Sequence, residues 1–344
     1  MYRCLYLANM AKNEVFPNPM VGSIIVHNHR IVGEGFHQTF GTAHAEVNAI
    51  TSVKDLSVLP KSTLYVNLEP CCHWGKTPPC TDLIIGSGIQ HVVIGCLDPN
   101  PLVAGQGIKK LEEAGIQVTS RVLESECLSF NHRFFQHISQ TSKIDFIVKW
   151  AESKDGFIGK TQYESALERE ISNAITKRWV HKLRSEVDGL MIGTNTAIID
   201  DPLLNNRYWI GKTPNIILLD KELKIPLTSQ LFKSRSKILI LTQQQQENVG
   251  NRVYLYLNFE QSAVNFWNQI NRILIAQNIF SVLLEGGAYT IQSFLESELA
   301  ADIWRIRSNN NLKQGIKAPL ISLTPVEHFE LGNNMVELLK KDAV

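Results

Sequence analysis

The chain has 344 residues, 44% of them hydrophobic, and a formal net charge of +1 at pH 7. This length exceeds the roughly 100–200 residues of one domain, so it predicts two domains that each bury a core. The near-neutral charge, without a basic run interleaved with aromatic residues, argues against nucleic acid or an anionic membrane surface as a partner.

The first 120 residues predict a layered α/β domain. Short runs rich in β-branched residues predict strands, and stretches with helical periodicity separate the later ones. A polar break at residues 28–30 suits a hairpin, whereas the helices between the later strands suit parallel crossovers, so we expect a mixed sheet. The expected strands are residues 21–26, 31–35, 64–68 and 91–95, and the expected helices are residues 43–53, 81–87 and 108–114.

A helical stretch at residues 124–140 leads into a polar run, after which a new strand pattern begins. We therefore expect one domain at residues 1–143 and a second at residues 144–344. The second half again alternates strand and helix patterns, which predicts another α/β domain. Its expected strands are residues 146–149, 189–193, 215–219, 238–242, 253–257 and 282–285, and its expected helices are residues 174–184, 266–275 and 288–295.

The first domain carries a candidate metal site. His44, Cys71 and Cys80 offer one imidazole and two thiols, and catalytic zinc usually takes three protein ligands and keeps one position for water. Glu46 is left over. A His-x-Glu pair followed by Pro-Cys and a second Cys is the pattern of the zinc deaminases, in which the Glu transfers protons. His73 is better explained as a group near the substrate than as a fourth ligand, and a structural zinc would leave Glu46 without a role.

Cysteine usage and hydropathy bear on the compartment. The six cysteines are irregularly spaced, which is typical of reduced intracellular thiols rather than of a disulfide framework. No apolar run of signal-peptide length opens the chain, and no stretch of about 18 uncharged apolar residues is present to span a bilayer. We expect a cytoplasmic protein that does not enter a membrane.

In the second domain, Gly286 and Gly287 end a predicted strand and open a predicted helix. A cofactor phosphate could approach backbone N–H groups there, although two glycines after a strand are more often only a tight turn. No Gly-x-Gly-x-x-Gly follows a strand in this half, which argues against a Rossmann-type site. Arg184 lies at a predicted helix end, where a cation complements the helix dipole, so its position alone favours a structural role.

The spacing of the metal motif narrows the class of deaminase. Eight residues separate Cys71 from Cys80, whereas deaminases of nucleic acids and free nucleosides usually have two. This loop, with Asn-Pro-Met-Val-Gly at residues 18–22 and Asp-Pro-Asn-Pro at residues 98–101, closely resembles the deaminase half of the bifunctional riboflavin-biosynthesis deaminase-reductases. Lys-x-Ala-x-Ser-x-Asp-Gly at residues 149–156 and Leu-Glu-Gly-Gly at residues 284–287 are similar to the reductase half. The resemblance covers nearly the whole chain.

The resemblance implies a fold and an activity. It implies a cytidine-deaminase-like three-layer α/β/α domain followed by a dihydrofolate-reductase-like α/β domain. The implied reactions are zinc-dependent hydrolytic deamination of a diamino-ribosylamino-pyrimidinone phosphate and NADPH-dependent reduction of its ribose to a ribityl chain. Zinc and NADPH would be the cofactors. The only implied partner is a small-molecule substrate, and family members tend to be homo-oligomers.

The resemblance also implies roles for single residues. His44, Cys71 and Cys80 would hold zinc. Glu46 would be the catalytic acid and base, and Asn18 would bind the pyrimidine edge. The implied substrate-binding residues of the second domain are Glu168, Arg184, Leu204, Arg207 and Glu285. The implied cofactor-binding residues are Ala151, Glu170, Thr196, Asp200, Gly287, Ala288, Tyr289, Thr290, Ile291, Gln292 and Ser293.

One segment departs from the family pattern. Most relatives have Ser-x-Trp-Ile-Thr where this chain has Glu168 and Glu170 in place of the Ser and the Trp. Two added negative charges near a phosphate are unfavourable unless Arg169 or Arg178 offsets them. This leaves open a deaminase whose second half is a degenerate, reductase-like scaffold. A deaminase acting on nucleic acid is disfavoured by the neutral charge and by the long cysteine loop.

Overall fold

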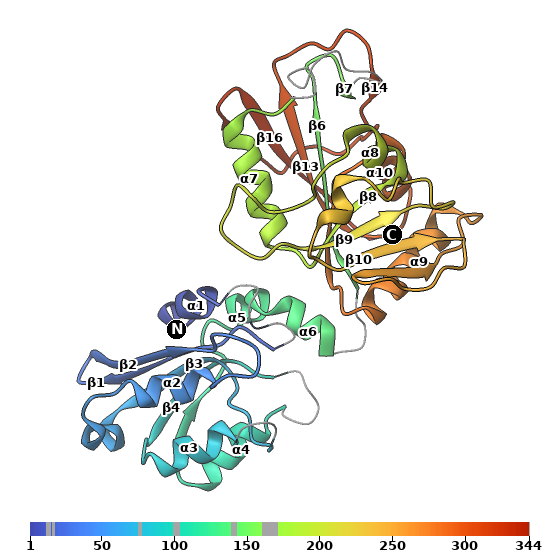
Figure 1. Ribbon diagram of the computed structural model, residues 1–344. Helices are drawn as coiled ribbons and strands as arrows, with labels where there is room; N and C mark the ends of the chain where they lie inside the picture. Colours follow the sequence, from blue (N-terminus) through green and yellow to red (C-terminus); the bar gives the residue numbers. More distant parts are fainter. Residues whose placement is uncertain are drawn as a thin grey trace. The chain divides into compact units, whose positions relative to one another are not determined.

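The computed structural model describes residues 1–11, 15, 18–74, 78–98, 104–138, 143–159 and 171–343. The chain divides into two compact units, residues 1–142 and residues 143–344 (Figure 1). Within the described residues, no helix is both long enough and apolar enough to cross a bilayer.

The first unit is built on a five-stranded sheet in the order β2–β1–β3–β4–β5. Strand β1 pairs antiparallel with β2 and β3, while β3, β4 and β5 are parallel, so the expected mixed sheet is confirmed. The strands are β1 Gly22–His27, β2 Arg30–Phe36, β3 Thr63–Leu68, β4 His91–Cys96 and β5 Gln117–Thr119. The helices are α1 Tyr2–Asn9, α2 Ala45–Thr51, the 3-10 helix η1 Leu56–Lys61, α3 Cys80–Gly86, α4 Gln106–Glu113, α5 Glu124–Phe130 and α6 His132–Ile138.

The predicted hairpin between β1 and β2 is confirmed. Its turn residues Asn28 and His29 have φ angles of 46° and 60°. Two successive positive φ angles match the turn whose twist suits the right-handed twist of paired strands. Asn and His adopt this region at lower cost than most residues, which explains why a short polar break is sufficient here.

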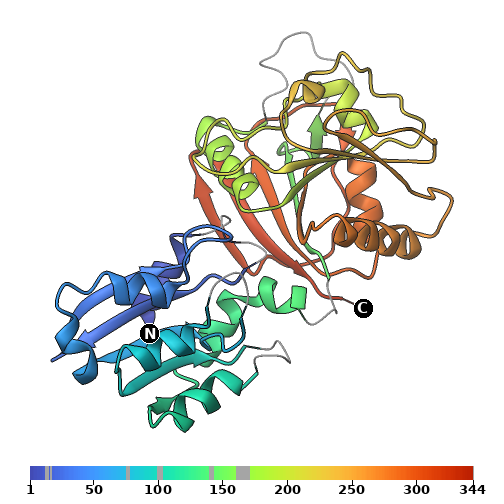
Figure 2. The same cartoon turned by 60° about the horizontal axis from the view of Figure 1, so that its bottom comes forward.

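Helices cover both faces of this sheet, because successive side chains of a strand point to opposite sides. Ile25 of β1 joins a core with α2, α3 and α4, whereas its neighbour Ile24 packs against α1. On the α1 side, Cys127 of α5 packs against Leu68 and Cys96. Figure 2 shows the sheet with helices on either side, and the three-layer α/β/α arrangement implied by the resemblance is confirmed.

The second unit is built on a nine-stranded sheet in the order β11–β10–β9–β8–β12–β6–β13–β16–β15. The strands from β11 to β13 are parallel, and β16 is antiparallel to β13 and β15. A separate small sheet pairs β7 with β14. The strands are β6 Asp145–Glu152, β7 Phe157–Gly159, β8 Gly189–Gly193, β9 Asn215–Leu219, β10 Ile238–Thr242, β11 Arg252–Tyr256, β12 Ser281–Leu284, β13 Ala301–Ser308, β14 Ile316–Lys317, β15 Glu327–Leu331 and β16 Asn334–Lys341.

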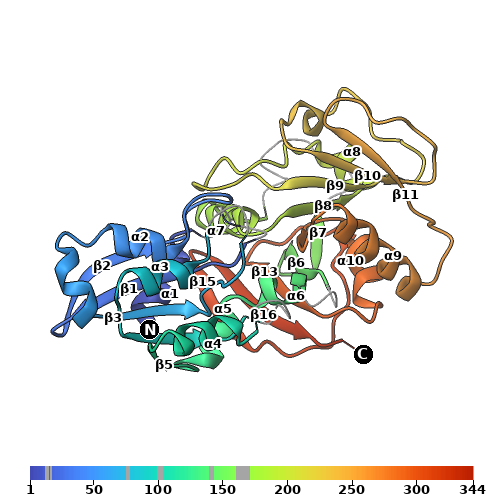
Figure 3. The same ribbon diagram turned by 90° about the horizontal axis from the view of Figure 1, so that it is seen from below.

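The helices of the second unit cover both faces of the large sheet. Helices α9 and α10 share one core and lie side by side (Figure 3), while α7 and α8 pack on the opposite face. The helices are α7 Ala174–Ser185, α8 Thr194–Asp200, the 3-10 helix η3 Gln230–Lys233, α9 Ala263–Ala276 and α10 Ala288–Leu295. The chain runs from β6 to β8, continues outward to β11, and then returns to place β12 between β8 and β6. Ligands of open parallel sheets bind at the carboxyl ends of the strands where such a reversal occurs.

All the strands and helices predicted within the described residues are present, but the structure adds others. The sequence patterns do not predict α1, α8 or the strands β13, β15 and β16. Strand β15 is mostly exposed and forms by pairing with β16, so it lacks a buried pattern of its own. The single helix predicted at residues 124–140 is two helices. They are separated at Asn131. The side-chain oxygen of Asn131 accepts from the backbone N–H of Met20, and its side-chain nitrogen donates to the carbonyl oxygen of Met20, both at 2.9 Å.

Gly35 of β2 determines how closely α2 packs on the sheet. A Cβ atom at Gly35 would lie 2.3 Å from the backbone nitrogen of Ala49 in α2. We predict that Gly35→Ala lowers the free energy of unfolding of the first unit by roughly 3 kcal/mol, because backbone must move to admit the methyl group. Urea denaturation measures this. The control is Gly86→Ala in α3, where a Cβ meets nothing within 4 Å and should be neutral or slightly stabilising. Equal stability of the two variants would contradict the prediction.

Candidate active sites

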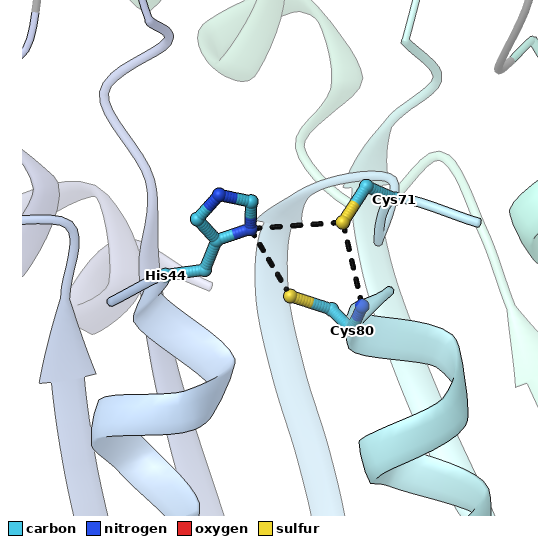
Figure 4. A group of neighbouring side chains, drawn as sticks. All are labelled: His44, Cys71 and Cys80. Atoms are coloured by element: carbon cyan, nitrogen blue, oxygen red, sulfur yellow. Dashed lines mark hydrogen bonds between the residues drawn. The ribbon is translucent and has the colours of Figure 1, made fainter. Parts of the chain in front are cut away.

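His44, Cys71 and Cys80 lie together in the first unit (Figure 4). His44 immediately precedes α2, Cys71 follows β3, and Cys80 is the first residue of α3. Their ligand atoms all lie within 4.8 Å of one another, and Nδ1 of His44 is 3.2 Å from Sγ of Cys80 and 3.6 Å from Sγ of Cys71. Usual zinc–sulfur and zinc–nitrogen lengths place two ligands of one tetrahedral ion roughly 3.6 Å apart. The three groups therefore fit a single zinc ion.

The surroundings shift the pKa values of the two thiols in opposite directions. The pKa of Cys71 is lowered, chiefly because the Cys80 thiol donates a hydrogen bond to it. The backbone N–H of Cys80 also donates to Sγ of Cys71, at 3.3 Å. The pKa of Cys80 is raised, first by this hydrogen bond to Cys71 and then by burial. The lowered pKa favours the thiolate form of Cys71, which is the form that coordinates zinc.

Glu46 lies in the first turn of α2 and is only 4% exposed. Burial raises the pKa of Glu46 to about 7, and the negative charge of Cys71 acts in the same direction. A carboxyl group with a pKa near neutrality can both accept and donate a proton under physiological conditions. Glu46 therefore has the position and the acidity of a proton carrier beside the metal ligands.

His37 and Asn18 extend this site. His37 is 3% exposed, and its ring packs edge-on against that of His44 with 5.5 Å between centroids. Its Nδ1 lies 3.0 Å from the carbonyl oxygen of Ala43, and its Nε2 lies 3.0 Å from the amide nitrogen of Asn18. Because the carbonyl can only accept, Nδ1 carries the hydrogen and Nε2 accepts from Asn18. The Asn18 amide is thereby oriented. No sequence motif pointed to His37.

Glu69, two residues before Cys71, anchors the loop on the far side of this site. Its buried carboxylate accepts four backbone N–H bonds at 2.9 to 3.3 Å, from Asp98, Gly105, Gly107 and Ile108. These donors include the start of α4, whose first N–H groups have no partners within the helix. Glu69 thus ties the strand that delivers Cys71 to the segment containing Asp98. The rest of the motif predicted at residues 98–101 and the loop residues 75–77 lie outside the described residues.

The second candidate site is a cavity of about 820 Å³ at the carboxyl ends of the parallel strands in the second unit. Twelve of the residues implied by the resemblance line it. They are Ala151, Arg184, Thr196, Asp200, Arg207, Glu285, Gly287, Ala288, Tyr289, Thr290, Ile291 and Ser293.

Two described residues implied by the resemblance, Leu204 and Gln292, are not among those that line the cavity. Leu204 packs in the core beneath it, and Gln292 bonds Glu296 and the backbone of Leu320 instead. Glu168 and Glu170 lie outside the described residues.

Glu285 organises the charges at one end of this cavity. Nε and Nη2 of Arg184 donate to its two carboxylate oxygens at 2.7 and 2.8 Å, and Nζ of Lys149 lies 3.3 Å from it. Burial opposes ionisation of Glu285, but Arg184 and then Lys149 outweigh it and lower the pKa of Glu285 to about 2. Nη1 of Arg184 donates to the carbonyl of Asn205 at 3.2 Å. Arg184 therefore holds Glu285 in place, and Lys149, which had no role assigned from the sequence, joins the site.

His181 and Tyr208 form part of the same wall, and neither was predicted. Burial lowers the pKa of His181 to about 4, with Arg184 adding to the effect, so this imidazole is neutral. Its ring contacts that of Tyr208 edge-on at 4.8 Å, and the guanidinium of Arg207 lies 4.7 Å from the centre of the Tyr208 ring. This side of the cavity thus presents two aromatic rings, those of His181 and Tyr208, next to the guanidinium of Arg207.

The glycines beside this cavity permit a close approach of chain segments. A Cβ atom at Gly286 would lie 2.8 Å from the side chain of Thr196, and one at Gly193 would lie 2.6 Å from that of Thr290. Gly287 has a φ of 77° and precedes α10, whose N-terminus has no side-chain cap. Unpaired N–H groups at such a helix start bind phosphate. The arrangement therefore fits the pyrophosphate of a dinucleotide cofactor.

Two family models match the chain. Residues 1–96 match the cytidine and deoxycytidylate deaminase zinc-binding region, and residues 145–303 match the RibD C-terminal domain. Among curated proteins, the riboflavin biosynthesis protein RibD of Aquifex aeolicus is 34% identical, with 100% of this chain and 96% of that protein covered. The RibD of a Synechocystis strain is 42% identical over 71% of this chain and 65% of that protein.

Solved structures agree over the full length. A diaminohydroxyphosphoribosylaminopyrimidine deaminase/5-amino-6-(5-phosphoribosylamino)uracil reductase from Thermotoga maritima superposes with a TM-score of 0.84 at 30% identity, covering 99% of this chain and 97% of that one. Acinetobacter baumannii RibD superposes with a TM-score of 0.84 at 28% identity, covering 98% and 96%. Both units of the chain thus have their counterparts within one polypeptide of each relative.

The grouping of ligand atoms predicts which cysteines retain zinc. The wild-type protein should bind roughly one zinc ion per chain. We expect Cys71→Ala and Cys80→Ala each to lose most of this zinc, because the two protein ligands that remain hold the ion poorly. Cys72→Ala is the matched control, since Cys72 adjoins Cys71 but is not in the grouped set. Metal content of the dialysed proteins by mass spectrometry gives the answer. Retention of zinc by both ligand variants would sink this assignment.

The charge cluster predicts a pH dependence. The folded-state pKa of Glu285 is about 2, below its usual 4.5, so its contribution to stability is present above pH 4.5 and is lost as the pH falls toward 2. We expect Glu285→Gln to lower the free energy of unfolding at pH 7 by about 3 kcal/mol, and this loss to shrink below pH 4.5. Urea titrations at several pH values measure it. Glu327→Gln, on the exposed strand β15, should stay within about 0.5 kcal/mol of the wild type.

Proposed function

Because the chain belongs to the RibD family of riboflavin biosynthesis proteins, we propose that residues 1–143 form its deaminase and residues 144–344 its reductase. The protein is a bifunctional enzyme, at once a hydrolase acting on a cyclic amidine and an NADP-dependent oxidoreductase. Its cofactors are zinc and NADPH. The order of the two matched regions along the chain supports this division.

We propose that the substrates are those named for the Thermotoga maritima relative. The deaminase then acts on a diaminohydroxyphosphoribosylaminopyrimidine, and the reductase acts on the resulting 5-amino-6-(5-phosphoribosylamino)uracil. Both are small molecules that carry a phosphate. The charged groups of the second cavity, among them Arg207, support a phosphorylated ligand there.

The single observation that carries the deaminase is the grouping of His44, Cys71 and Cys80 beside the buried Glu46. When bound by these residues, zinc activates a water molecule for attack. Glu46 accepts one proton from the attacking water and delivers it to a ring nitrogen. It then takes the remaining proton from the same oxygen and delivers it to the departing amino group. The carbon–oxygen bond forms, the carbon–nitrogen bond breaks, and ammonia leaves a carbonyl behind. Asn18, oriented by His37, is placed to bind the pyrimidine edge.

In the reductase, NADPH bound in this cavity would supply a hydride, and the protein would position the sugar carbonyl that receives it. We propose that Lys149, held by Glu285, donates the proton that the reduced sugar oxygen requires. Arg184 fixes Glu285 so that this ammonium group stays at the cavity. The cavity residues implied by the resemblance keep their proposed roles in cofactor and substrate binding. The roles of Leu204 and Gln292 are proposals that the lining of the cavity does not support, and those of Glu168 and Glu170 are proposals about residues outside the described part of the chain.

We also propose a cytoplasmic homo-oligomer that binds neither nucleic acid nor membrane. All six cysteines are free thiols, which supports a reducing compartment. The net charge of +1 supports the absence of a polyanionic partner.

Mass analysis of the products tests both activities together. The purified protein should convert the diaminopyrimidine substrate to a product heavier by about one mass unit without NADPH. With NADPH present, we expect a further gain of about two mass units from reduction of the sugar. Absence of that second gain, with deamination intact, would favour the alternative in which the second half is a degenerate scaffold.

Glu46→Gln separates proton transfer from metal binding. We predict that this variant retains zinc but deaminates at least about 100-fold more slowly, because the amide cannot carry protons. Its reduction of the deaminated substrate should be unchanged, which serves as the internal control. Deamination at the wild-type rate would place the proton carrier elsewhere.

A further inference from the structure

The cavity of the second unit extends across the ends of four neighbouring strands. In sheet order these are β6, β12, β8 and β9, and they supply Lys149, Glu285, Gly193 and Asp220 to the lining. Neighbouring strands lie about 4.8 Å apart, so three spacings separate the two ends by roughly 14 Å. A ligand that fills the cavity is therefore an extended molecule lying across the sheet.

The two ends of the cavity differ in chemistry. Lys149 and Glu285 mark the β6 end as the place of reduction, and the turn at Gly286 and Gly287 provides a phosphate cradle in the middle. A dinucleotide has its pyrophosphate in the middle and its nicotinamide at one end. The adenosine end of NADPH then lies at the carboxyl end of β9. This step rests on the reductase function proposed above.

At the β9 end, the carboxylate of Asp220 is occupied by hydrogen bonds from other groups of the protein. Asp220 is 3% exposed, and it accepts hydrogen bonds from the backbone of Lys224 and Ile225, each at 3.0 Å, and from the hydroxyl of Thr194 at 3.2 Å. Sites that select NAD commonly use an acid after such a strand to bind the ribose hydroxyl, whereas sites for NADP use a cation. The carboxylate of Asp220 instead stabilises the turn at residues 220–225, so we do not assign it to binding a ribose hydroxyl.

Two cations of this turn line the cavity. The side chain of Lys221 pairs with Glu260, and that of Lys224 pairs with Glu222 at 2.6 Å. All four side chains are at least 40% exposed. Exposed ion pairs of this kind contribute little, so each ammonium group can turn to a doubly charged phosphate at low cost.

We propose that Lys221 and Lys224 bind the 2′-phosphate of NADPH and thereby select NADPH over NADH. The turn held by Asp220 presents both ammonium groups at the β9 end of the cavity. Glu222 competes with the phosphate for Lys224, so removing its charge should strengthen binding. The selection is thus a balance of charges within one short turn.

Two probes that differ only in the 2′-phosphate test this proposal in the full-length protein. They are adenosine 2′,5′-bisphosphate and adenosine 5′-monophosphate, titrated by calorimetry in the absence of substrate. We expect Lys221→Gln and Lys224→Gln each to raise the Kd of the bisphosphate about tenfold and that of the monophosphate less than about twofold. Glu222→Gln should lower the Kd of the bisphosphate. Lys340→Gln is the matched control, because Lys340 is an exposed lysine of β16 that pairs with Asp302 of β13.

The same variants should lose preference for NADPH over NADH in equilibrium binding, and unchanged thermal unfolding midpoints would show that the fold is intact. The proposal fails if the wild type prefers the bisphosphate and both lysine variants keep that preference. It also fails if the wild type binds neither NADPH nor the bisphosphate, and in that case the proposed reductase function fails with it. If the lysine variants merely keep the preference for the bisphosphate, the proposed reductase function is not affected.

Discussion

The deaminase site depends on bringing one imidazole and two thiols from three separate chain segments to within 4.8 Å. The sheet makes this possible, because β3 delivers Cys71 at its carboxyl end while α2 and α3 begin at the same edge. Gly33 and Gly35 of β2 allow the backbone of α2 to lie directly on the sheet. The helix start that carries His44 and Glu46 is thereby held in place by backbone packing as well as by side chains.

A buried glutamate stands at the centre of each candidate site, and the two have opposite acidities. Burial and the nearby thiolate raise the pKa of Glu46 to about 7, so it can exchange protons. The side chain of Glu285 is 7% exposed, but Arg184 and Lys149 lower its pKa to about 2, so it stays ionised. The same type of side chain is thus proposed for proton transfer in one unit and for charge positioning in the other, and the environment alone sets the difference in pKa.

The second cavity follows from the order of strands in its sheet. The chain reverses direction across the sheet between β8 and β12, and the cavity lies at the carboxyl ends of these strands. A Cβ atom at Gly193 would meet Thr290 of α10, and one at Gly286 would meet Thr196 of α8, so larger side chains would collide there. The glycine turn before α10, the charge cluster at Glu285 and the lysines of the β9 turn all line this cavity, and the proposed extended cofactor would lie across them.

The sequence by itself determined the elements and the chemistry that local patterns encode. Runs of β-branched residues predicted the central strands, and the identity and spacing of His44, Glu46, Cys71 and Cys80 predicted a zinc site because few residue types bind that metal. Only the tertiary structure decided which distant groups meet. Arg184 and Glu285 are 101 positions apart, and only the fold brings the guanidinium of Arg184 against the carboxylate of Glu285.

Dependence on distant partners also explains the contacts and the strand that the sequence patterns did not predict. They include the contact of His37 with Asn18, the hydrogen bonds that Glu69 accepts from the start of α4, and strand β15. A local pattern encodes what a residue can do, whereas packing decides which partner it finds.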